Sequence, residues 1–199
     1  MFEFERTTGF PDRGALLPLG VAVALVAIVA SIVFAAVQAF YVEGSSMAPS
    51  LHNGQLLIVN KVAYLRLDET PIAQFLSDGQ TGAPHYVFGG PQRGDVVVFQ
   101  APTTVEDCDY VKRLIALPGD TVVVRAGRVF VNGQPMDEGY VKFGDDYTYP
   151  TDGTPLRVPE GAYFVLGDNR GASVDSHLGW FVPADNLVGP GVALPLGIG

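Results

Sequence analysis

The feature that most constrains this chain is a long segment without formal charge near its start. Between Gly14 and Val42 there is no Asp, Glu, Lys or Arg, and most residues are Val, Ala, Leu or Ile. A helix of roughly 20 apolar residues crosses the hydrocarbon core of a bilayer. Pro18 lies near the predicted start, where a missing backbone N–H costs least. Residues 14–42 are therefore predicted to form one transmembrane helix that anchors the chain.

Basic residues on either side of this segment indicate its orientation. Arg6 and Arg13 precede it, and the next Lys or Arg along the chain is Lys61. The positive-inside rule then predicts a single-pass protein of the plasma (inner) membrane, in contact with membrane lipid. Residues 1–13 are expected to be cytoplasmic, and residues 43–199 are expected to be extracytoplasmic.

A cleaved signal peptide is the alternative interpretation of the segment. Val37, Gln38 and Ala39 place small residues at suitable offsets for cleavage. The apolar region of a signal peptide has only about 7–15 residues, however, so a retained anchor is favoured. Both interpretations place the rest of the chain outside the cytoplasm.

Composition excludes several classes of function. The net charge of −9 disfavours nucleic acid as a partner, because phosphates require a basic surface. Cys108 is the only cysteine, so no intramolecular disulfide is possible. No group of cysteines and histidines has metal-ligand spacing, and we expect no metal and no other cofactor.

The rest of the chain alternates short apolar runs with turn formers. Six runs are predicted to be strands: residues 55–59, 95–99, 109–115, 121–124, 128–131 and 162–166. Asn132-Gly133 favours a hairpin after the fifth. The predicted fold is mostly β, a coiled antiparallel sheet or partly closed barrel after the transmembrane helix. Residues 66–92 contain many turn formers and are predicted to be a surface insertion, and the apolar tail 188–199 is too short and interrupted to span a membrane.

Ser46 is the first candidate for chemistry, because it directly follows the predicted anchor. A serine hydroxyl is essentially un-ionised at neutral pH and needs a nearby base. The three histidines lie in turn-like or irregular segments, and the G-x-S-x-G pattern fails because Ala48 occupies its last position. The S-x-x-K pattern fails too, because Pro49 stands three residues after Ser46.

Lys112 is the other candidate base. It lies in a strand-like run whose neighbours include Val111 and Leu114. Burial disfavours the charged form of lysine and lowers its pKa. Lowering that pKa from about 10.4 to about 8 requires roughly 3 kcal/mol from the fold. The residues alone leave open that Ser46 merely ends a turn and that Lys112 is a solvated strand residue.

Four motifs resemble those of the type I signal peptidases, in the same order and after a single apolar span. Residues 46–51 resemble Ser-Met-x-Pro-Thr-Leu, with serine in place of threonine, and residues 93–99 match Arg-Gly-Asp-(Val/Ile)-Val-Val-Phe. Residues 110–120 resemble Tyr-(Ile/Val)-Lys-Arg-x-(Ile/Val)-Gly-Leu-Pro-Gly-Asp, with alanine where glycine is usual. Residues 167–176 match Gly-Asp-Asn-Arg-x-x-Ser-x-Asp-Ser. The resemblance covers nearly the whole chain.

The resemblance implies a membrane-bound serine endopeptidase that removes N-terminal signal peptides from secreted preproteins after small residues, in an Ala-x-Ala pattern. It implies Ser46 as nucleophile, Lys112 as neutral general base, Ser173 as the hydroxyl that orients the amine, and Asp175 as a carboxylate that braces the loop. The positions that resemble the family's substrate pockets are Phe40, Val42, Met47, Leu57, Tyr110 and Val111. The expected partners are secreted preproteins, membrane lipid and the protein translocation channel.

Two further positions depart from the family pattern. Some relatives carry a hydroxyl two residues before the nucleophile that helps to bind the oxyanion, but Gly44 stands there in this chain. The family usually has arginine after the Asp-Ser pair, whereas this chain has His177. His177 is either an ordinary exposed side chain or a weaker, pH-sensitive partner of Asp175.

Three other functions are each compatible with part of the sequence. A catalytically inactive, membrane-anchored binding module of the same fold would lack Ser46 or Lys112, and both are present. A self-cleaving Ser-Lys protease of the SOS-repressor type predicts a DNA-binding domain ahead of the serine, where this chain has the apolar segment. A hydrolase that uses Cys108 has no histidine close in sequence to support it.

Overall fold

The computed structural model describes residues 13–66, 86–102, 104–105, 108–141 and 146–195, and the side chains from Gly20 onward. The chain divides into two compact units after Ala36. The first unit contains the helix α1 (Arg13–Ala36), whose exposed side chains are apolar and include Val26 and Phe34. Among the side chains described, no helix combines the length and hydropathy expected of a membrane span.

The helix ends earlier than the predicted anchor. We expected the anchor to reach Val42, but residues 37–41 form the strand β1 (Val37–Tyr41). This strand pairs antiparallel with β2 (Leu56–Asn60), with Val37 opposite Asn60 and Tyr41 opposite Leu56. An apolar run is compatible with a helix and with a strand, so the pairing with β2 decides the outcome.

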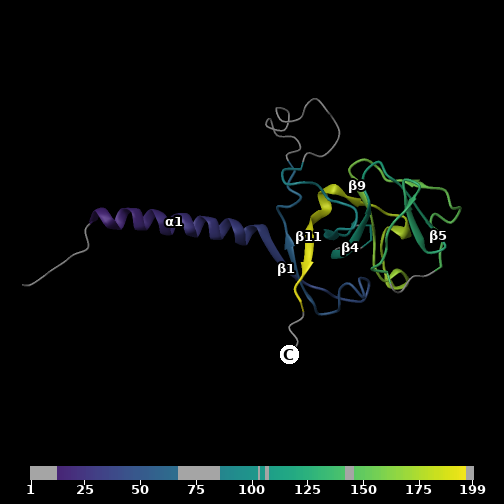
Figure 1. The fold of residues 1–199 in the computed structure, drawn as a ribbon, viewed down its shortest axis with the longest axis horizontal. Coiled ribbons are helices and arrows are strands. Elements are labelled where there is room, and N and C mark those ends of the chain that lie inside the picture. Colours follow the sequence, from purple (N-terminus) through teal and green to yellow (C-terminus); the bar gives the residue numbers. More distant parts are fainter. Residues whose placement is uncertain (1–12, 67–85, 103, 106–107, 142–145, 196–199) are drawn as a thin grey trace, which may run out of the picture. The chain divides into compact units, whose positions relative to one another are not determined.

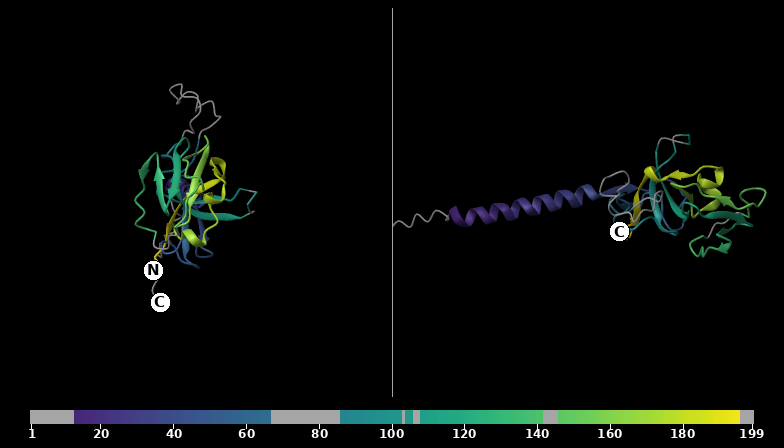
Figure 2. Two further views of the ribbon diagram at one scale, coloured as in Figure 1. Left: turned by 90° about the vertical axis from the view of Figure 1, so that its right-hand side faces the viewer. Right: turned by 90° about the horizontal axis from the view of Figure 1, so that it is seen from above.

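The second unit is built on a seven-stranded antiparallel sheet (Figure 1). Its order is β1, β2, β11 (Leu187–Ala193), β3 (Val96–Gln100), β4 (Asp109–Ala116), β9 (Ala162–Leu166) and β10 (Val182–Pro183). The order is linear and the sheet is curled, as Figure 2 shows, so it forms a half-barrel. The prediction of a mostly β, antiparallel and partly closed fold is confirmed.

A smaller sheet of four strands lies beside the first one in the chain's second unit. Its order is β7 (Gln134–Pro135), β6 (Arg128–Val131), β5 (Thr121–Arg125) and β8 (Leu156–Arg157). The predicted hairpin is present, because Asn132 (φ 52°) and Gly133 (φ 78°) connect β6 to β7 in the conformation that tight hairpin turns require. Three short 3₁₀ helices, η1 (Arg170–Ala172), η2 (Ser176–Leu178) and η3 (Ala184–Asn186), complete the structure.

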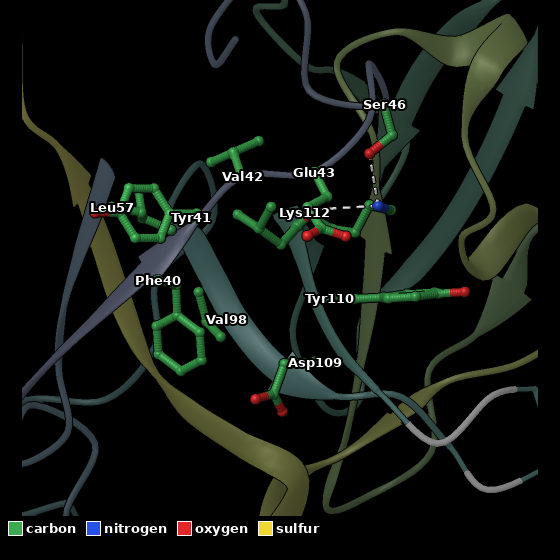
Figure 3. Close-up of a pocket in the computed structure, with 11 residues that line it drawn as sticks. Phe40, Tyr41, Val42, Glu43, Ser46, Leu57, Val98, Asp109, Tyr110 and Lys112 are labelled. Atoms are coloured by element: carbon green, nitrogen blue, oxygen red, sulfur yellow. Dashed lines mark hydrogen bonds between the residues drawn. The ribbon is translucent and has the colours of Figure 1, made fainter. Parts of the chain in front are cut away.

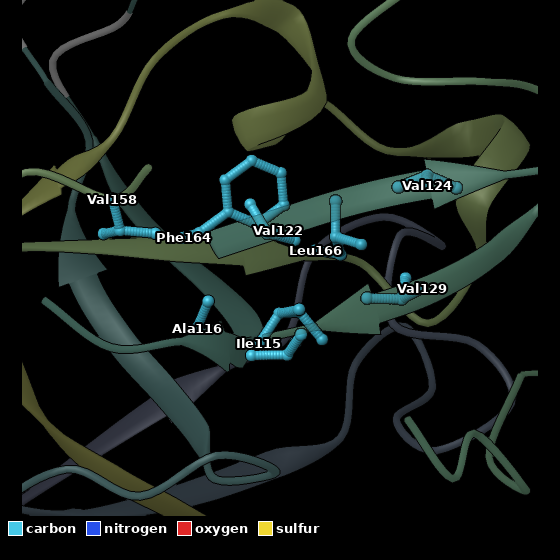
Figure 4. Packing of buried hydrophobic residues seen from close by; sticks show 9 residues of the cluster. Ile115, Ala116, Val122, Val124, Val129, Val158, Phe164 and Leu166 are labelled. Atoms are coloured by element: carbon cyan, nitrogen blue, oxygen red, sulfur yellow. The ribbon is translucent and has the colours of Figure 1, made fainter. Parts of the chain in front are cut away.

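The two sheets share an apolar core (Figure 4). The ends of β4 and β9 supply Ile115, Phe164 and Leu166, and the small sheet supplies Val122 and Val129. All of these side chains are at most 1% exposed. Full burial of such a side chain contributes about 1.5–3 kcal/mol, which explains how strands of four or five residues remain ordered here. This core holds the β4 and β9 strands against each other, and both lead to the site described below.

The strand β11 was not predicted, because its sequence contains Gly189, Pro190 and Gly191. It lies between β2 and β3 and pairs with both. A β-carbon at Gly189 would lie 2.2 Å from the carbonyl oxygen of Asn60, so glycine is required for this close approach.

Most of the predicted insertion, residues 67–85, lies outside the described residues. The two ends of the insertion are joined by a β-bridge between Arg66 and Tyr86. Arg66 also forms an ion pair with Asp185 of η3. These contacts hold Arg66 and Tyr86 in the second unit. That the segment between them is a surface insertion stays a prediction.

Candidate catalytic site

Ser46 lies in the loop that joins β1 to β2. The loop turns tightly, because the Ala48 N–H donates to the Ser45 carbonyl and the Leu51 N–H donates to the Met47 carbonyl. The carbonyl of Ser46 accepts a hydrogen bond of 2.9 Å from the backbone N–H of Asn169, far along the chain. These contacts fix the backbone of Ser46 while its side chain stays partly exposed.

Gly44 helps to shape the same loop. Its φ of +85° lies in the left-handed region, and its N–H donates to the side-chain oxygen of Asn53 at 2.8 Å. A serine at this position would be strained in that conformation. The serine or threonine hydroxyl that some relatives carry at this position is absent from the sequence. The backbone conformation at Gly44 would also disfavour such a residue there.

Lys112 is in the middle of β4, opposite Val97 of β3. Side chains alternate along a strand, so Lys112 shares its face with Leu114, which is fully buried. Lys112 itself is only 4% exposed. Its amine nitrogen Nζ lies 2.8 Å from the Oγ of Ser46 and 3.1 Å from the carbonyl oxygen of Val111 (Figure 3). The two side chains singled out in the sequence are therefore in contact.

Burial lowers the pKa of Lys112 from 10.5 to about 8. The charge of Asp175, and to a smaller extent that of Cys108, acts in the opposite direction and favours the ammonium form. The lowering by burial outweighs both. A substantial fraction of Lys112 is therefore neutral in mildly alkaline solution, and a neutral amine at hydrogen-bond distance can accept the proton of a hydroxyl.

Asp175 holds the loop that follows β9. It is completely buried, and its Oδ2 accepts the N–H of Gly167 at 2.8 Å. Its Oδ1 accepts the backbone N–H of His177 at 3.2 Å and contacts the Nδ1 of the same residue at 2.6 Å. The role of a bracing carboxylate, which the resemblance implied, agrees with these contacts, and His177 is the partner of Asp175 rather than a free surface histidine.

Ser173 does not make the contact that the resemblance implied. Its Oγ is buried and has no hydrogen-bond partner within the described part of the chain, and the amine of Lys112 bonds Ser46 and Val111 instead. Ser173 nevertheless belongs to the loop that packs against the Ser46 backbone. The Ser173 Oγ and the Ser46 carbonyl oxygen both lie next to Gly167. Its role in orienting the amine stays a prediction.

Gly167 is a site residue whose importance sequence reasoning missed, because it looked like an ordinary turn former. A β-carbon at this position would lie 2.2 Å from the Oγ of Ser173 and 2.5 Å from the carbonyl oxygen of Ser46. The absence of a side chain is what allows the two loops to meet.

We expect Gly167→Ala to lower the kcat/KM of any reaction in which Ser46 takes part by about 100-fold, because overpacking must displace the Ser46 backbone and small displacements of reacting groups cost rates of this order. Gly139→Ala is a matched control, since a β-carbon there meets only the Asp137 side chain at 3.9 Å. Steady-state kinetics on both variants checks the prediction, and a Gly167→Ala protein as active as the control would contradict it.

Asp168 was expected only to shape a turn, but it forms a buried ion pair. Both of its carboxylate oxygens accept from the guanidinium of Arg113, from Nε at 2.8 Å and from Nη2 at 2.6 Å. Arg113 also donates from Nη1 to the carbonyl of Gly94, and its guanidinium lies 3.9 Å from the ring centre of Tyr140. Because Arg113 follows Lys112 directly, this pair fixes β4 to the loop after β9.

A pocket opens beside the Ser46 and Lys112 side chains (Figure 3). Five of the six predicted substrate positions line it: Phe40, Val42, Leu57, Tyr110 and Val111. Met47 is the exception, because its side chain points into the core and is 1% exposed. Met47 packs in the apolar cluster that also contains Leu57 and Val98, behind the wall of this pocket, and its role in binding substrate stays a prediction.

Four further residues line the pocket and were missed: Tyr41, Glu43, Val98 and Asp109. The strand register contains the signal for one of them, because Val98 lies opposite Val111 in the β3–β4 pairing. β9 pairs with β4 only from Arg113 onward, so among the described strands residues 109–112 have β3 on one side alone. That open edge of β4 lies along the pocket and can accept an extended peptide.

Among the described residues, no three or more His, Cys, Asp or Glu side chains gather in a way that suits a metal ion. The groups present at the site are a hydroxyl, a buried amine and an open strand edge beside a pocket lined by both apolar and polar side chains. Together these groups suit nucleophilic attack on a carbonyl carbon of an extended peptide.

Comparison with known proteins identifies what this chain resembles. Residues 16–194 match the family model described as signal peptidase, peptidase S26. Signal peptidase I of Leptolyngbya laminosa is 35% identical over 161 residues, which cover 78% of this chain and 66% of that protein. Signal peptidase I of Bacillus caldolyticus is 37% identical over 187 residues, which cover 89% of this chain and 87% of that protein.

The relatives differ in how much of their own length the chain spans. It covers 66% of the Leptolyngbya protein, and 66% and 60% of two probable signal peptidases I of Synechocystis. A crystal structure of a signal peptidase I from Enterococcus faecalis is 36% identical, with 51% of this chain and 97% of that chain covered and a TM-score of 0.45.

Proposed function

Because this chain belongs to the signal peptidase family, peptidase S26, we propose that it is a membrane-bound serine endopeptidase that removes N-terminal signal peptides from secreted preproteins. The observation that carries the proposal is the 2.8 Å contact between the Ser46 hydroxyl and the buried amine of Lys112. The family membership supports a peptidase, and the contact supports a Ser-Lys pair as its means of catalysis.

In the proposed reaction, neutral Lys112 takes the proton of the Ser46 hydroxyl as the oxygen attacks the scissile carbonyl carbon. The carbonyl becomes an oxyanion, which the backbone N–H of Ser46 stabilises, as the resemblance implies. Collapse of this intermediate breaks the C–N bond, and the Lys112 ammonium returns the proton to the leaving amine. Water then attacks the ester on Ser46 with Lys112 again as the base, and the free serine is regenerated.

The rate is predicted to rise with pH and to reach half of its plateau near pH 8. Lys112 acts only when it is neutral, and the neutral fraction grows as the pH passes the lowered pKa of about 8. A pH profile of kcat/KM on a peptide without titratable side chains measures this directly. A profile that is flat between pH 6 and 9, or that falls over this range, would count against a lysine base.

The pocket supports a preference for small, apolar residues before the cleaved bond. Phe40, Leu57 and Val98 are apolar, and Leu57 and Val98 are buried, so the walls on this side leave limited room. An extended substrate that pairs with the open edge at residues 109–112 points alternate side chains into the pocket, which matches an Ala-x-Ala pattern. A peptide series with Ala, Val and Phe at the last position before the cut tests this, with Ala expected to be cleaved fastest.

The experiment that tests the function uses the full chain in detergent micelles with a secreted preprotein. Cleavage is expected after a small residue, and Ser46→Ala is expected to abolish it. Ser45→Ala is the matched control, since it removes the neighbouring, exposed hydroxyl. A Ser46→Ala protein that still cleaves would reject Ser46 as the nucleophile, and a wild-type protein that binds the preprotein without cleaving it would favour the alternative of an inactive binding module.

We also propose that α1, which begins at Arg13 and covers the first part of the uncharged segment from Gly14 to Val42, anchors the protein in the plasma (inner) membrane with residues 43–199 outside. Support comes from the exposed apolar side chains of α1 and from the placement of Arg6 and Arg13 ahead of the segment. The single, exposed Cys108 provides the test. A membrane-impermeant maleimide is expected to label it in intact cells, whereas labelling only after lysis would contradict this topology. Membrane lipid and the protein translocation channel are the corresponding partners.

A further inference from the structure

His177 and Asp175 form a close pair beside the proposed reactive centre. The Nδ1 of His177 lies 2.6 Å from the Oδ1 of Asp175, at the start of η2. Asp175 is completely buried, and His177 is partly exposed, with its ring 5.5 Å from that of Tyr147. The hydrogen bond to Asp175 raises the pKa of His177, and burial opposes this to a smaller extent. The histidine can therefore exchange protons with solvent while its partner carboxylate cannot reach water.

The same carboxylate acts on Lys112. Its charge favours the ammonium form of Lys112 against the larger effect of burial. It is also linked to the Ser46 loop, since its second oxygen holds the N–H of Gly167, and Gly167 packs against the Ser46 carbonyl. A change in the net charge of the His177–Asp175 pair therefore changes the electrostatic stabilisation of the Lys112 ammonium, the group that must lose its proton.

Two neighbours of the pair, Arg170 and Tyr147, keep a constant charge, so the titration of His177 sets the net charge of the pair. Arg170 is buried, disfavours the protonated form of His177, and is itself paired with Glu138. Burial raises the pKa of Tyr147 to about 12, so its hydroxyl stays neutral. Lys112 is the remaining group, and its titration near pH 8 is the event to be controlled.

Resting on the function proposed above, we propose that His177 is a positioning residue that sets the pH range of the reaction by controlling the net charge of Asp175, in the loop that packs against the Ser46 backbone. Protonated His177 cancels the charge of Asp175, so the ammonium of Lys112 loses its stabilising neighbour and deprotonates more readily. Neutral His177 leaves the carboxylate uncompensated, so Lys112 keeps its proton to higher pH. The two titrations are coupled, and each shifts the other by the same amount.

The first test compares the pH profiles of His177→Arg and His177→Gln in the full chain. Arginine cancels the charge of Asp175 at every pH, whereas glutamine leaves it uncompensated at every pH. We expect the acidic limb of kcat/KM to lie about half a pH unit lower in His177→Arg than in His177→Gln, with the wild type between them. The matched control is His52→Gln, which removes an exposed histidine from the Ser46 loop and is expected to leave the limb in place. Equal losses of activity at every pH in both variants would show that His177 only braces the loop, and would overturn the proposal.

The second test does not depend on peptidase activity or on a stable His177 variant. The chain has three histidines, and NMR titration of their rings in detergent micelles follows each one. Lys112→Met removes the positive charge, so His177 should bind its proton more tightly, with a midpoint about half a pH unit higher than in the wild type. Identical midpoints in the two proteins would overturn the proposal whether or not the protein cleaves preproteins. A shifted midpoint in a protein without activity would instead reject the proposed function and leave the coupling in place.

Discussion

Lys112→Met is expected to lower kcat by about 1,000-fold or more, because a positioned general base typically contributes 10²–10⁴. Methionine has a similar length and keeps the buried volume filled, while Ser46 and the pocket remain. The expected effect falls on kcat, with KM little changed, because the apolar walls of the pocket and the backbone edge of β4 remain in the variant. Single-turnover cleavage of a preprotein measures it.

The same variant should be more stable than the wild type, which separates loss of the base from loss of the fold. The pKa of Lys112 falls from 10.5 in a free side chain to about 8 in the folded protein. The unfolded chain therefore holds this proton more tightly, so the penalty for burying the charge is complete below pH 8 and disappears as the pH rises through 8 to 10.5. Methionine removes up to about 3 kcal/mol of that penalty at pH 7.

Lys61→Met provides the control for loss of a lysine, since Lys61 is exposed and outside the pocket. It should retain full activity and wild-type stability. If Lys112→Met kept more than a tenth of the wild-type kcat, the amine would not be the base. An inactive Lys112→Met protein with a lowered midpoint of unfolding would indicate damage to the fold instead.

Asp168→Asn is expected to destabilise the protein by about 3 kcal/mol, the scale found when one member of a buried ion pair is removed. Asp168 is completely buried, and the side chain of Arg113 is only 12% exposed. Asparagine keeps the shape but leaves the guanidinium without its counter-charge. Urea unfolding, followed through the fluorescence of the single tryptophan, Trp180, measures the change.

Glu160→Gln is the matched control for the ion pair. It breaks the pair between Arg157 and Glu160, whose side chains are 71% and 72% exposed, and should change stability by no more than about 0.5 kcal/mol. Combining Asp168→Leu with Arg113→Met removes both charges and should recover most of the loss. Equal effects from Asp168→Asn and Glu160→Gln would show that the buried pair is not what holds β4 to the loop after β9.

The sequence predicts those parts of the molecule whose local pattern matches their final environment. The strands β3, β5 and β9 are continuous apolar runs bounded by turn formers, and each is buried in the structure almost throughout. The pairing of Ser46 with Lys112 could be proposed from the family resemblance, but the distance between them depends on the strand register and on the loop contacts of Ser46.

The parts that were missed depend on partners distant in sequence. β1 has the same apolar character as the helix before it, and only the pairing with β2 makes it a strand. β11 contains residues that disfavour strands, and Gly189 is tolerated because the backbone of Asn60 approaches so closely. The close packing of Gly167 and the ion pair of Asp168 are equally invisible in a local pattern, because their partners Ser46 and Arg113 come from other segments.

The place of β11 in the sheet determines when the protein can become active during its synthesis. β1 and β2, which carry the Ser46 loop, join β3 and β4, which carry Lys112, through β11 alone among the described strands of that sheet. β11 follows Lys112 and all the other described strands of that sheet in chain order. A nascent chain therefore has both reactive side chains long before it has the strand that brings their two halves together, and it should stay inactive until β11 has been synthesised and has joined the sheet.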